Sequence, residues 1–123
     1  MTAQAFRSAV ERGDHEAAVA LLAPDVTFHS PIVHRTYQGR AAVAPVLSAV
    51  VTVFEDFRYT AEYVSADGSG AVLAFSCRVG ERDLDGVDIL RFGADGDIVE
   101  FTVMVRPYSA ATALRERMAA LLA

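Results

Sequence analysis

Residues 87–103 read VDILRFGADGDIVEFTV, and the fold prediction starts from this pattern. Apolar and polar residues largely alternate in the two halves of the stretch, which is the period of a half-buried β-strand. Ala94, Asp95 and Gly96 lie between the halves and are typical of a tight turn. The stretch therefore predicts two antiparallel strands joined in a hairpin.

The rest of the chain extends this hairpin into a larger sheet and adds helices. Strands are predicted at residues 26–30, 57–66, 71–80, 84–92 and 97–107. Helices are predicted at residues 3–12, 15–23, 40–54 and 109–122, and a polar loop at 31–38. This order predicts a single α+β domain over residues 1–123, with a curved, mostly antiparallel sheet covered on one face by helices. Because the other face needs cover too, we expect a homodimer through the sheet.

Composition and charge exclude several classes of function. The formal net charge is −5 and lysine is absent, which argues against nucleic-acid binding and Schiff-base chemistry. No apolar run reaches the roughly 18 residues of a membrane span, and no secretory signal is visible, so we expect a cytoplasmic protein. Cys77 is the one cysteine, and no spacing resembles a metal site, so no cofactor is expected. DLDGVD (83–88) is predicted to be a hairpin turn rather than a calcium loop.

Three segments carry a resemblance to a known superfamily. ERGDHEAAVALLAPDVTFHSP (11–31), YQGRAAV (37–43) and VDILRFGADGDIVEFTV (87–103) follow one another with an order and spacing similar to those of nuclear transport factor 2-like proteins. These relatives include the ketosteroid isomerases and the SnoaL-like polyketide cyclases. The resemblance implies a cone-shaped fold with an apolar cavity between the helices and the concave sheet face. It also implies a hydrophobic small molecule as the partner.

The ketosteroid isomerase pattern implies roles for three positions. Its general base precedes the proline that ends the first strand, and Ser30 occupies that position here. Its tyrosine on the first helix corresponds to Phe6, which has no hydroxyl group. Its protonated aspartate is kept as Asp88. One of the three functional groups is therefore retained.

Asp88 is the strongest candidate for acid–base chemistry. It shares a strand face with Leu90 and Phe92, and an acid on an apolar face must be paired or protonated because burying a bare charge is costly. An apolar site raises a carboxyl pKa and keeps the group as a hydrogen-bond donor, as it does for an aspartic acid in ketosteroid isomerase. The alternatives are an ion pair with an arginine across the sheet, or a position at the sheet rim.

His29 and Ser30 are adjacent, but they do not form a catalytic pair. Side chains alternate across a strand, so the two point to opposite faces and cannot make the hydrogen bond that a nucleophile and its base require. Ser30 either caps the turn around Pro31 or contacts a ligand. His29 is predicted to lie on the surface or in an interface.

The remaining candidates line the expected pocket. They are Phe6, Leu22, Phe28, Val46, Leu47, Phe101, Val103, His34 and Tyr37. Two functions follow from the resemblance. The first is a cofactor-free isomerase or cyclase acting on a hydrophobic carbonyl compound, with Asp88 as the acid or as the hydrogen-bond donor to a developing enolate and Ser30 orienting the carbonyl group. The second is a non-catalytic module that binds a small ligand or another protein. Whether His29 or His34 replaces the missing general base stays open.

Overall fold

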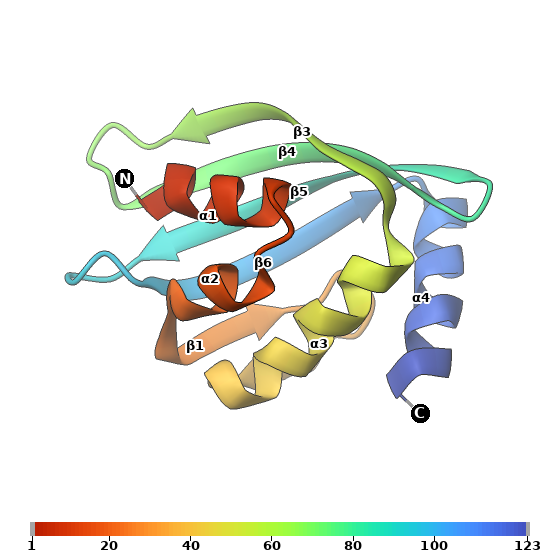
Figure 1. The fold of residues 1–123 in the computed structure, drawn as a ribbon, viewed down its shortest axis with the longest axis horizontal. Helices are drawn as coiled ribbons and strands as arrows, with labels where there is room; N and C mark the ends of the chain where they lie inside the picture. The colour runs from red at the N-terminus through yellow and green to blue at the C-terminus, as the bar shows by residue number, and fades with distance from the viewer. Residues whose placement is uncertain (1, 123) are drawn as a thin grey trace.

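The computed structural model describes residues 2–122, which form one curved sheet and four helices (Figure 1). The helices are α1 (Thr2–Glu11), α2 (His15–Ala20), α3 (Arg40–Val53) and α4 (Tyr108–Leu122). The strands are β1 (Leu22–His29), β2 (Thr36–Gln38), β3 (Glu55–Val64), β4 (Gly70–Val79), β5 (Arg82–Phe92) and β6 (Ile98–Arg106). The α+β class predicted from the sequence is confirmed.

The six strands pair in the order β2-β1-β6-β5-β4-β3. Every neighbouring pair is antiparallel except β1 and β6, which run parallel, so the prediction of a mostly antiparallel sheet is also confirmed. The predicted hairpin of residues 87–103 forms the β5–β6 pair at the centre of the sheet. Its register places Asp88 opposite Val103 on β6 and opposite Leu73 on β4. Asp88 therefore lies far from both edges of the sheet.

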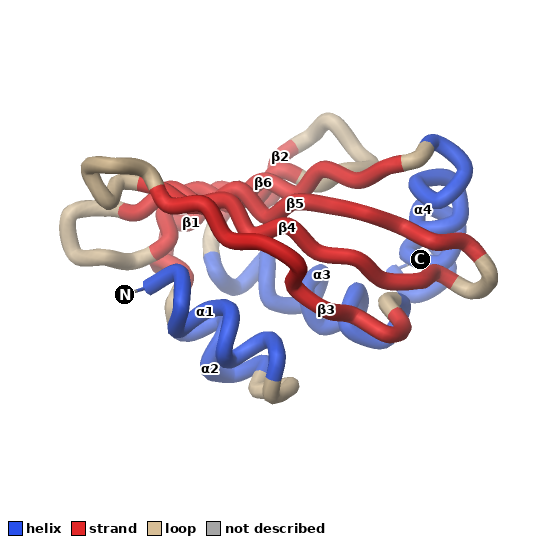
Figure 2. The backbone as a smooth tube through the Cα atoms, turned by 90° about the horizontal axis from the view of Figure 1, so that it is seen from above, coloured by secondary structure: helices blue, strands red, loops and turns tan. Residues whose placement is uncertain are grey.

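The helices lie on one side of the sheet (Figure 2). Helices α1, α2 and α3 pass beneath its concave inner face, and α4 lies at the end of the sheet where β4 and β5 meet. No helix of residues 2–122 covers the outer face. The candidate site lies between this inner face and the helices.

Buried and partly buried residues alternate strictly along β4, and this pattern shows how the sequence forms the inner face. Ala71, Leu73, Phe75, Cys77 and Val79 are all buried, whereas the residues between them are only partly buried. Side chains on a strand alternate between faces, so the same five residues pack against the helices. Burying each large apolar side chain contributes about 1.5–3 kcal/mol to folding, which fixes the register of the strand.

Three local predictions were wrong. The helix predicted over 15–23 ends at Ala20, because Leu22 enters β1 and is fully buried opposite Ile98. The loop predicted over 31–38 contains a short strand, β2, which pairs with β1. The hairpin turn predicted for DLDGVD lies inside β5 instead, because its residues continue the ladder with β4. No helix of residues 2–122 has the length and apolar character needed to cross a membrane.

Candidate active site

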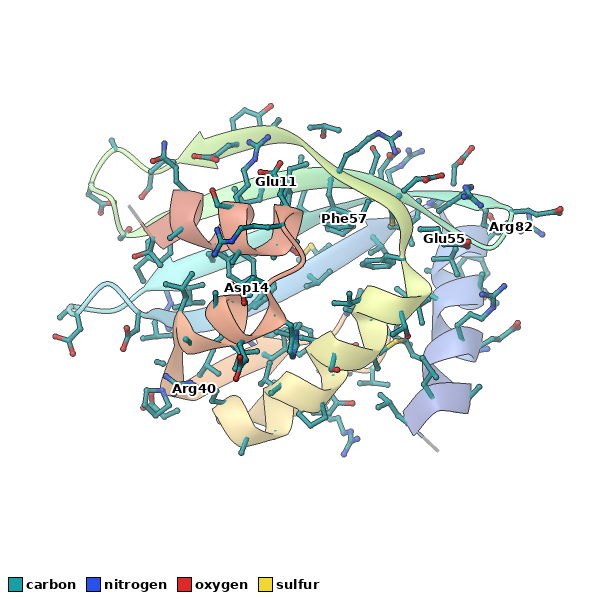
Figure 3. The ribbon with its side chains drawn as sticks, viewed as in Figure 1. Glu11, Asp14, Arg40, Glu55, Phe57 and Arg82 are labelled. Carbon is teal, nitrogen blue, oxygen red and sulfur yellow. The ribbon has the colours of Figure 1, made fainter. Side chains whose placement is uncertain are left out.

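A cavity of about 570 Å³ lies between the inner face of the sheet and the helices. Asp14, at the start of α2, and Phe57, on β3, both border it (Figure 3). Its wall is mostly apolar and rich in aromatic side chains, because every phenylalanine and tyrosine of the chain except Tyr63, Phe92 and Tyr108 contributes to it. The cavity therefore suits an apolar ligand with flat or ring-shaped parts.

Two aromatic groups face the cavity from different parts of the sheet. On the side of β3, the ring of Phe57 stacks on that of Phe75 with centroids 4.9 Å apart and meets Tyr59 edge to face at 5.0 Å. On the side of β1, Phe28 meets Phe101 edge to face at 5.3 Å, and Phe6 of α1 meets the same Phe101 ring at 5.5 Å. Within each group the rings hold one another in place, so the wall is built before a ligand arrives.

Asp88 lies on β5 and is the one Asp, Glu, His or Arg of residues 2–122 that is buried. Its side chain points to the inner face because Leu84 and Leu90, an even number of positions away, are buried on that face. It also borders the cavity. The prediction that Asp88 occupies an apolar face thus agrees with its position, and the predicted alternatives of an arginine pair or a rim position do not describe it.

The partner of Asp88 is Tyr59, which was not predicted from the sequence. The Tyr59 hydroxyl donates to Asp88 Oδ2 at 2.9 Å, across the intervening strand β4. Tyr59 is itself buried, and the Arg7 guanidinium lies over its ring at 5.7 Å from the centroid. The alternation of FRYTAEYV places Tyr59 on one face with Phe57, but alternation alone does not show which acid a tyrosine reaches.

Burial raises the pKa of Asp88 from 3.8 to about 7, because the apolar surroundings disfavour the charged carboxylate. The hydrogen bond from Tyr59 acts in the opposite direction and lowers this pKa, since it stabilises the carboxylate. Burial also raises the pKa of Tyr59, and the Asp88 carboxylate raises it further, so Tyr59 stays protonated. Near neutral pH, Asp88 is therefore present in both protonation states, and Tyr59 is a fixed donor to it.

Gly86 shapes the wall next to Asp88. Both residues face inward on β5, and a Cβ atom added at Gly86 would lie only 2.3 Å from Phe75 Cζ and 2.9 Å from the backbone oxygen of Met104. The ring of Phe75 therefore occupies the space that a side chain at position 86 would fill. Glycine is required here for this close approach, and it determines how far Phe75 extends into the cavity.

Ser30 caps a turn and borders the cavity as well. Its Oγ accepts hydrogen bonds from the backbone N–H of Ile32 at 3.0 Å and of Val33 at 3.4 Å. The two readings left open by the sequence are therefore compatible, because the Oγ–H proton remains available for a ligand. Ser30 itself is not a base near pH 7.

Neither His29 nor His34, the two possible replacements for the missing general base, borders the main cavity. His29 lies on the outer side of β1, where its Nε2 is 2.8 Å from Glu100 Oε2. His34 is exposed, and both border a second pocket that is also lined by Thr102 and Met104 of β6. His15, at the start of α2, is the histidine that borders the main cavity. No role was predicted for His15 from the sequence.

Most of the predicted pocket residues border the cavity. They are Phe6, Phe28, Tyr37, Val46, Leu47, Phe101 and Val103. The structure places the other two elsewhere. Leu22 is fully buried where β1 begins, and it packs in the core instead of facing the open space. His34 lies in the loop before β2 and faces solvent.

Cys77 and the acidic residues give no sign of a further reactive centre. Burial raises the pKa of the Cys77 thiol to about 12, so it stays protonated and unreactive on the inner face of β4. Within residues 2–122, no three His, Cys, Asp or Glu side chains are grouped so that they could hold a metal ion. Asp88 is the cavity-lining acid whose pKa lies near neutrality.

Comparisons with known proteins agree with this architecture. A family model described as a SnoaL-like domain matches residues 3–101. The chain is 47% identical to a steroid delta-isomerase from Pseudomonas aeruginosa, with a TM-score of 0.93, over 98% of this chain and 88% of that one. It is 40% identical to a protein with a cystatin-like fold from Silicibacter pomeroyi, with a TM-score of 0.90, over 97% of this chain and 83% of that one.

A more distant match shows the fold alone. The chain is 19% identical to a putative polyketide cyclase from Pseudomonas putida, with a TM-score of 0.72, over 89% of this chain and 91% of that one. No curated protein matches the sequence.

Proposed function

Because the chain belongs to the SnoaL-like domain family, with the nuclear transport factor 2-like fold predicted from its sequence, we propose that it is an acid–base enzyme. It isomerises or cyclises a hydrophobic carbonyl compound and uses no cofactor for this. The observation that carries the proposal is the buried Asp88 carboxyl group in an apolar cavity, with a pKa of about 7. General acid–base catalysis is most efficient when the pKa of the group lies near the working pH.

Asp88 is the proposed catalytic acid–base group. In its ionised form, it takes a proton from the carbon next to the ligand's carbonyl group, and in its protonated form it returns that proton to another carbon. Tyr59 holds Oδ2 through its hydrogen bond, and Asp88 makes no other side-chain hydrogen bond within residues 2–122, which leaves Oδ1 for the ligand. Tyr59 is thus a positioning residue.

Ser30 is the proposed donor to the ligand's carbonyl oxygen. Its Oγ already accepts two backbone hydrogen bonds, so its own proton is free to be donated to the negative charge that develops on that oxygen. Ser30, which occupies the position of the family's general base, would thus act as a hydrogen-bond donor instead of a base. It also requires the ligand to extend from Ser30 to Asp88 across the cavity that both residues border.

Exchange of ligand protons in deuterated water tests this function. A Δ5-3-ketosteroid and an aromatic polyketide ketone are the first ligands to use, because the relatives include a steroid delta-isomerase and a putative polyketide cyclase. We expect Asp88→Asn to abolish exchange and Asp85→Asn to leave it unchanged, since Asp85 is exposed on the same strand and pairs with Arg106 at 3.1 Å. Exchange that persists in Asp88→Asn would exclude Asp88 as the proton carrier.

The second candidate function is a non-catalytic ligand-binding module. Phe6 on α1 favours it, because this residue provides an apolar wall where the family pattern has a tyrosine hydroxyl. The same ligands discriminate between the two functions. A ligand that binds in the cavity without any exchange of its acidic protons in the wild-type protein identifies a binding module.

A second copy of the chain is the proposed partner for the outer face of the sheet. Two rows of neighbouring residues form a largely apolar band there: Val72, Ile89 and Thr102, then Ala74, Val87 and Met104. Charged pairs flank the band on both sides, Arg91 with Glu100 at 3.0 Å and Arg106 with Asp85 at 3.1 Å. An apolar centre with a polar rim is the usual anatomy of a protein interface.

A further inference from the structure

Arg115 is the one arginine of residues 2–122 on the border of a mostly apolar cavity. It lies on α4, where Leu114, Met118 and Leu122 face the cavity at intervals of four residues. The helix closes one end of the space beneath the sheet (Figure 2), and Leu114 is almost completely buried in it. Arg115 follows Leu114 and is itself exposed, so it lies where the cavity meets solvent.

Within residues 2–122, Arg115 forms no ion pair and donates no side-chain hydrogen bond, which distinguishes it from eight of the eleven arginines of the chain. Five arginines form ion pairs with Asp or Glu: Arg7, Arg12, Arg78, Arg91 and Arg106. Three others, Arg35, Arg40 and Arg58, donate to a tyrosine hydroxyl or to backbone oxygens. Of the arginines left, Arg115 is the one that borders the cavity.

The carboxylate of Asp14 does not neutralise this part of the cavity. Asp14 also borders the cavity, but its Oδ1 accepts from the backbone N–H of Ala17 at 3.1 Å and its Oδ2 pairs with Arg12 at 3.4 Å. The other cavity carboxyl, Asp88, is buried and bonded to Tyr59. The charge on Arg115 is therefore available to a ligand.

We infer that the ligand of this cavity is an amphiphile whose anionic group pairs with Arg115 while its apolar body extends inward toward Asp88. The inference rests on the proposed function, because it needs a hydrophobic ligand in the cavity, and it adds a charge to that ligand. A guanidinium group recognises carboxylate, sulfonate and phosphate through paired N–H donors. The positive charge of Arg115 also disfavours positively charged ligands at this border.

Two fluorescent probes that differ in one group test the inference. Anilinonaphthalene sulfonate carries the anion, and N-phenyl-naphthylamine has the same aromatic body without it. We expect both to bind the wild-type protein and to compete with each other for the cavity. We expect Arg115→Gln to weaken sulfonate binding by up to about fivefold, the upper end for a solvent-exposed ion pair, and to leave naphthylamine binding unchanged.

Arg82→Gln is the matched control, because Arg82 also lacks an ion-pair partner within residues 2–122 but lies at the β4–β5 hairpin, away from the cavity (Figure 3). It should change neither affinity, and Arg115→Lys should keep part of the sulfonate preference. Circular dichroism confirms that each variant is folded. If Arg115→Gln weakens the binding of both probes equally, or changes the binding of neither, the inference is overturned and the proposed function stays intact. Failure of both probes to bind the wild-type protein overturns both.

Discussion

Tyr59 and Asp88 form a buried hydrogen bond of 2.9 Å that joins β3 to β5 across the inner face of β4. Both side chains are shielded from solvent, and the Asp88 carboxyl group has its hydrogen bond from a neutral hydroxyl instead of from a cation. The bond lowers the pKa of Asp88 while burial raises it, so the protonation state of the acid depends on a balance between two opposing effects. Substitutions can change the hydrogen bond and the burial separately.

Removing the Tyr59 hydroxyl should raise the pKa of Asp88 above its value of about 7. Tyr59→Phe keeps the burial but deletes the donor that stabilises the carboxylate, and the loss of a hydrogen bond to a charged group corresponds to about one pKa unit or more. Carboxyl carbon NMR titration measures the shift, with Asp88→Asn for assignment. Tyr63→Phe, at an exposed tyrosine of the same strand, is the control. An unchanged or lowered pKa would contradict the role given to Tyr59.

The raised pKa of Asp88 should make the protein less stable as pH rises from about 4 to about 7. The unfolded chain has the ordinary carboxyl pKa of 3.8, so in this window the folded state binds more protons and folding weakens as they are lost. The accumulated effect is on the order of 4 kcal/mol, and it is complete above pH 7. Asp88→Asn removes it, because an amide does not ionise.

Urea unfolding of the wild-type protein and of Asp88→Asn at pH 5 and pH 8 measures this difference. We expect the free energy of unfolding of Asp88→Asn, relative to that of the wild type, to be higher at pH 8 than at pH 5. Taking the difference between the two proteins cancels other groups, such as Asp67, whose pKa is lowered to about 2 by hydrogen bonds from Ser69 and Ser65. Asp85→Asn controls for an amide at an exposed position of β5. A difference that is the same at both pH values would mean that Asp88 is solvated.

The site was predictable from the sequence only where a single strand determines it. Alternation along residues 87–92 places Asp88 among apolar residues, and the same argument separates His29 from Ser30. The partner of Asp88 was not predictable, because Tyr59 lies 29 residues away on a strand that is not adjacent to β5. The family pattern directs the search for a hydroxyl to α1, where Phe6 has none. Arg115 was missed for a similar reason, since the packing of α4 against the cavity is a tertiary feature.

The Gly86→Ala substitution should reduce the cavity and destabilise the fold. The new methyl group would meet the Phe75 ring and the Met104 backbone oxygen, so the ring must turn into the cavity and β5 must shift. Overpacking of this kind costs about 1–3 kcal/mol. We expect a lower midpoint in urea unfolding and weaker binding of N-phenyl-naphthylamine. Adding Phe75→Leu should restore part of the urea midpoint and part of the naphthylamine affinity. If the double variant matches Gly86→Ala in both measurements, the contact with the Met104 backbone oxygen dominates.

A charge placed in the centre of the outer sheet face should dissociate the proposed dimer. Met104 is 56% exposed within the apolar band, so Met104→Glu should not disturb the core. In a symmetric interface the new carboxylate would be buried near its own copy, and leaving such a charge unpaired costs several kcal/mol. Sedimentation equilibrium measures the mass of the wild-type protein and of the variant. Leu121→Glu is the matched control, because Leu121 is 54% exposed but lies on α4. A wild-type protein that sediments as a monomer, or a Met104→Glu dimer as tight as the wild type, would show that a second copy does not cover this face.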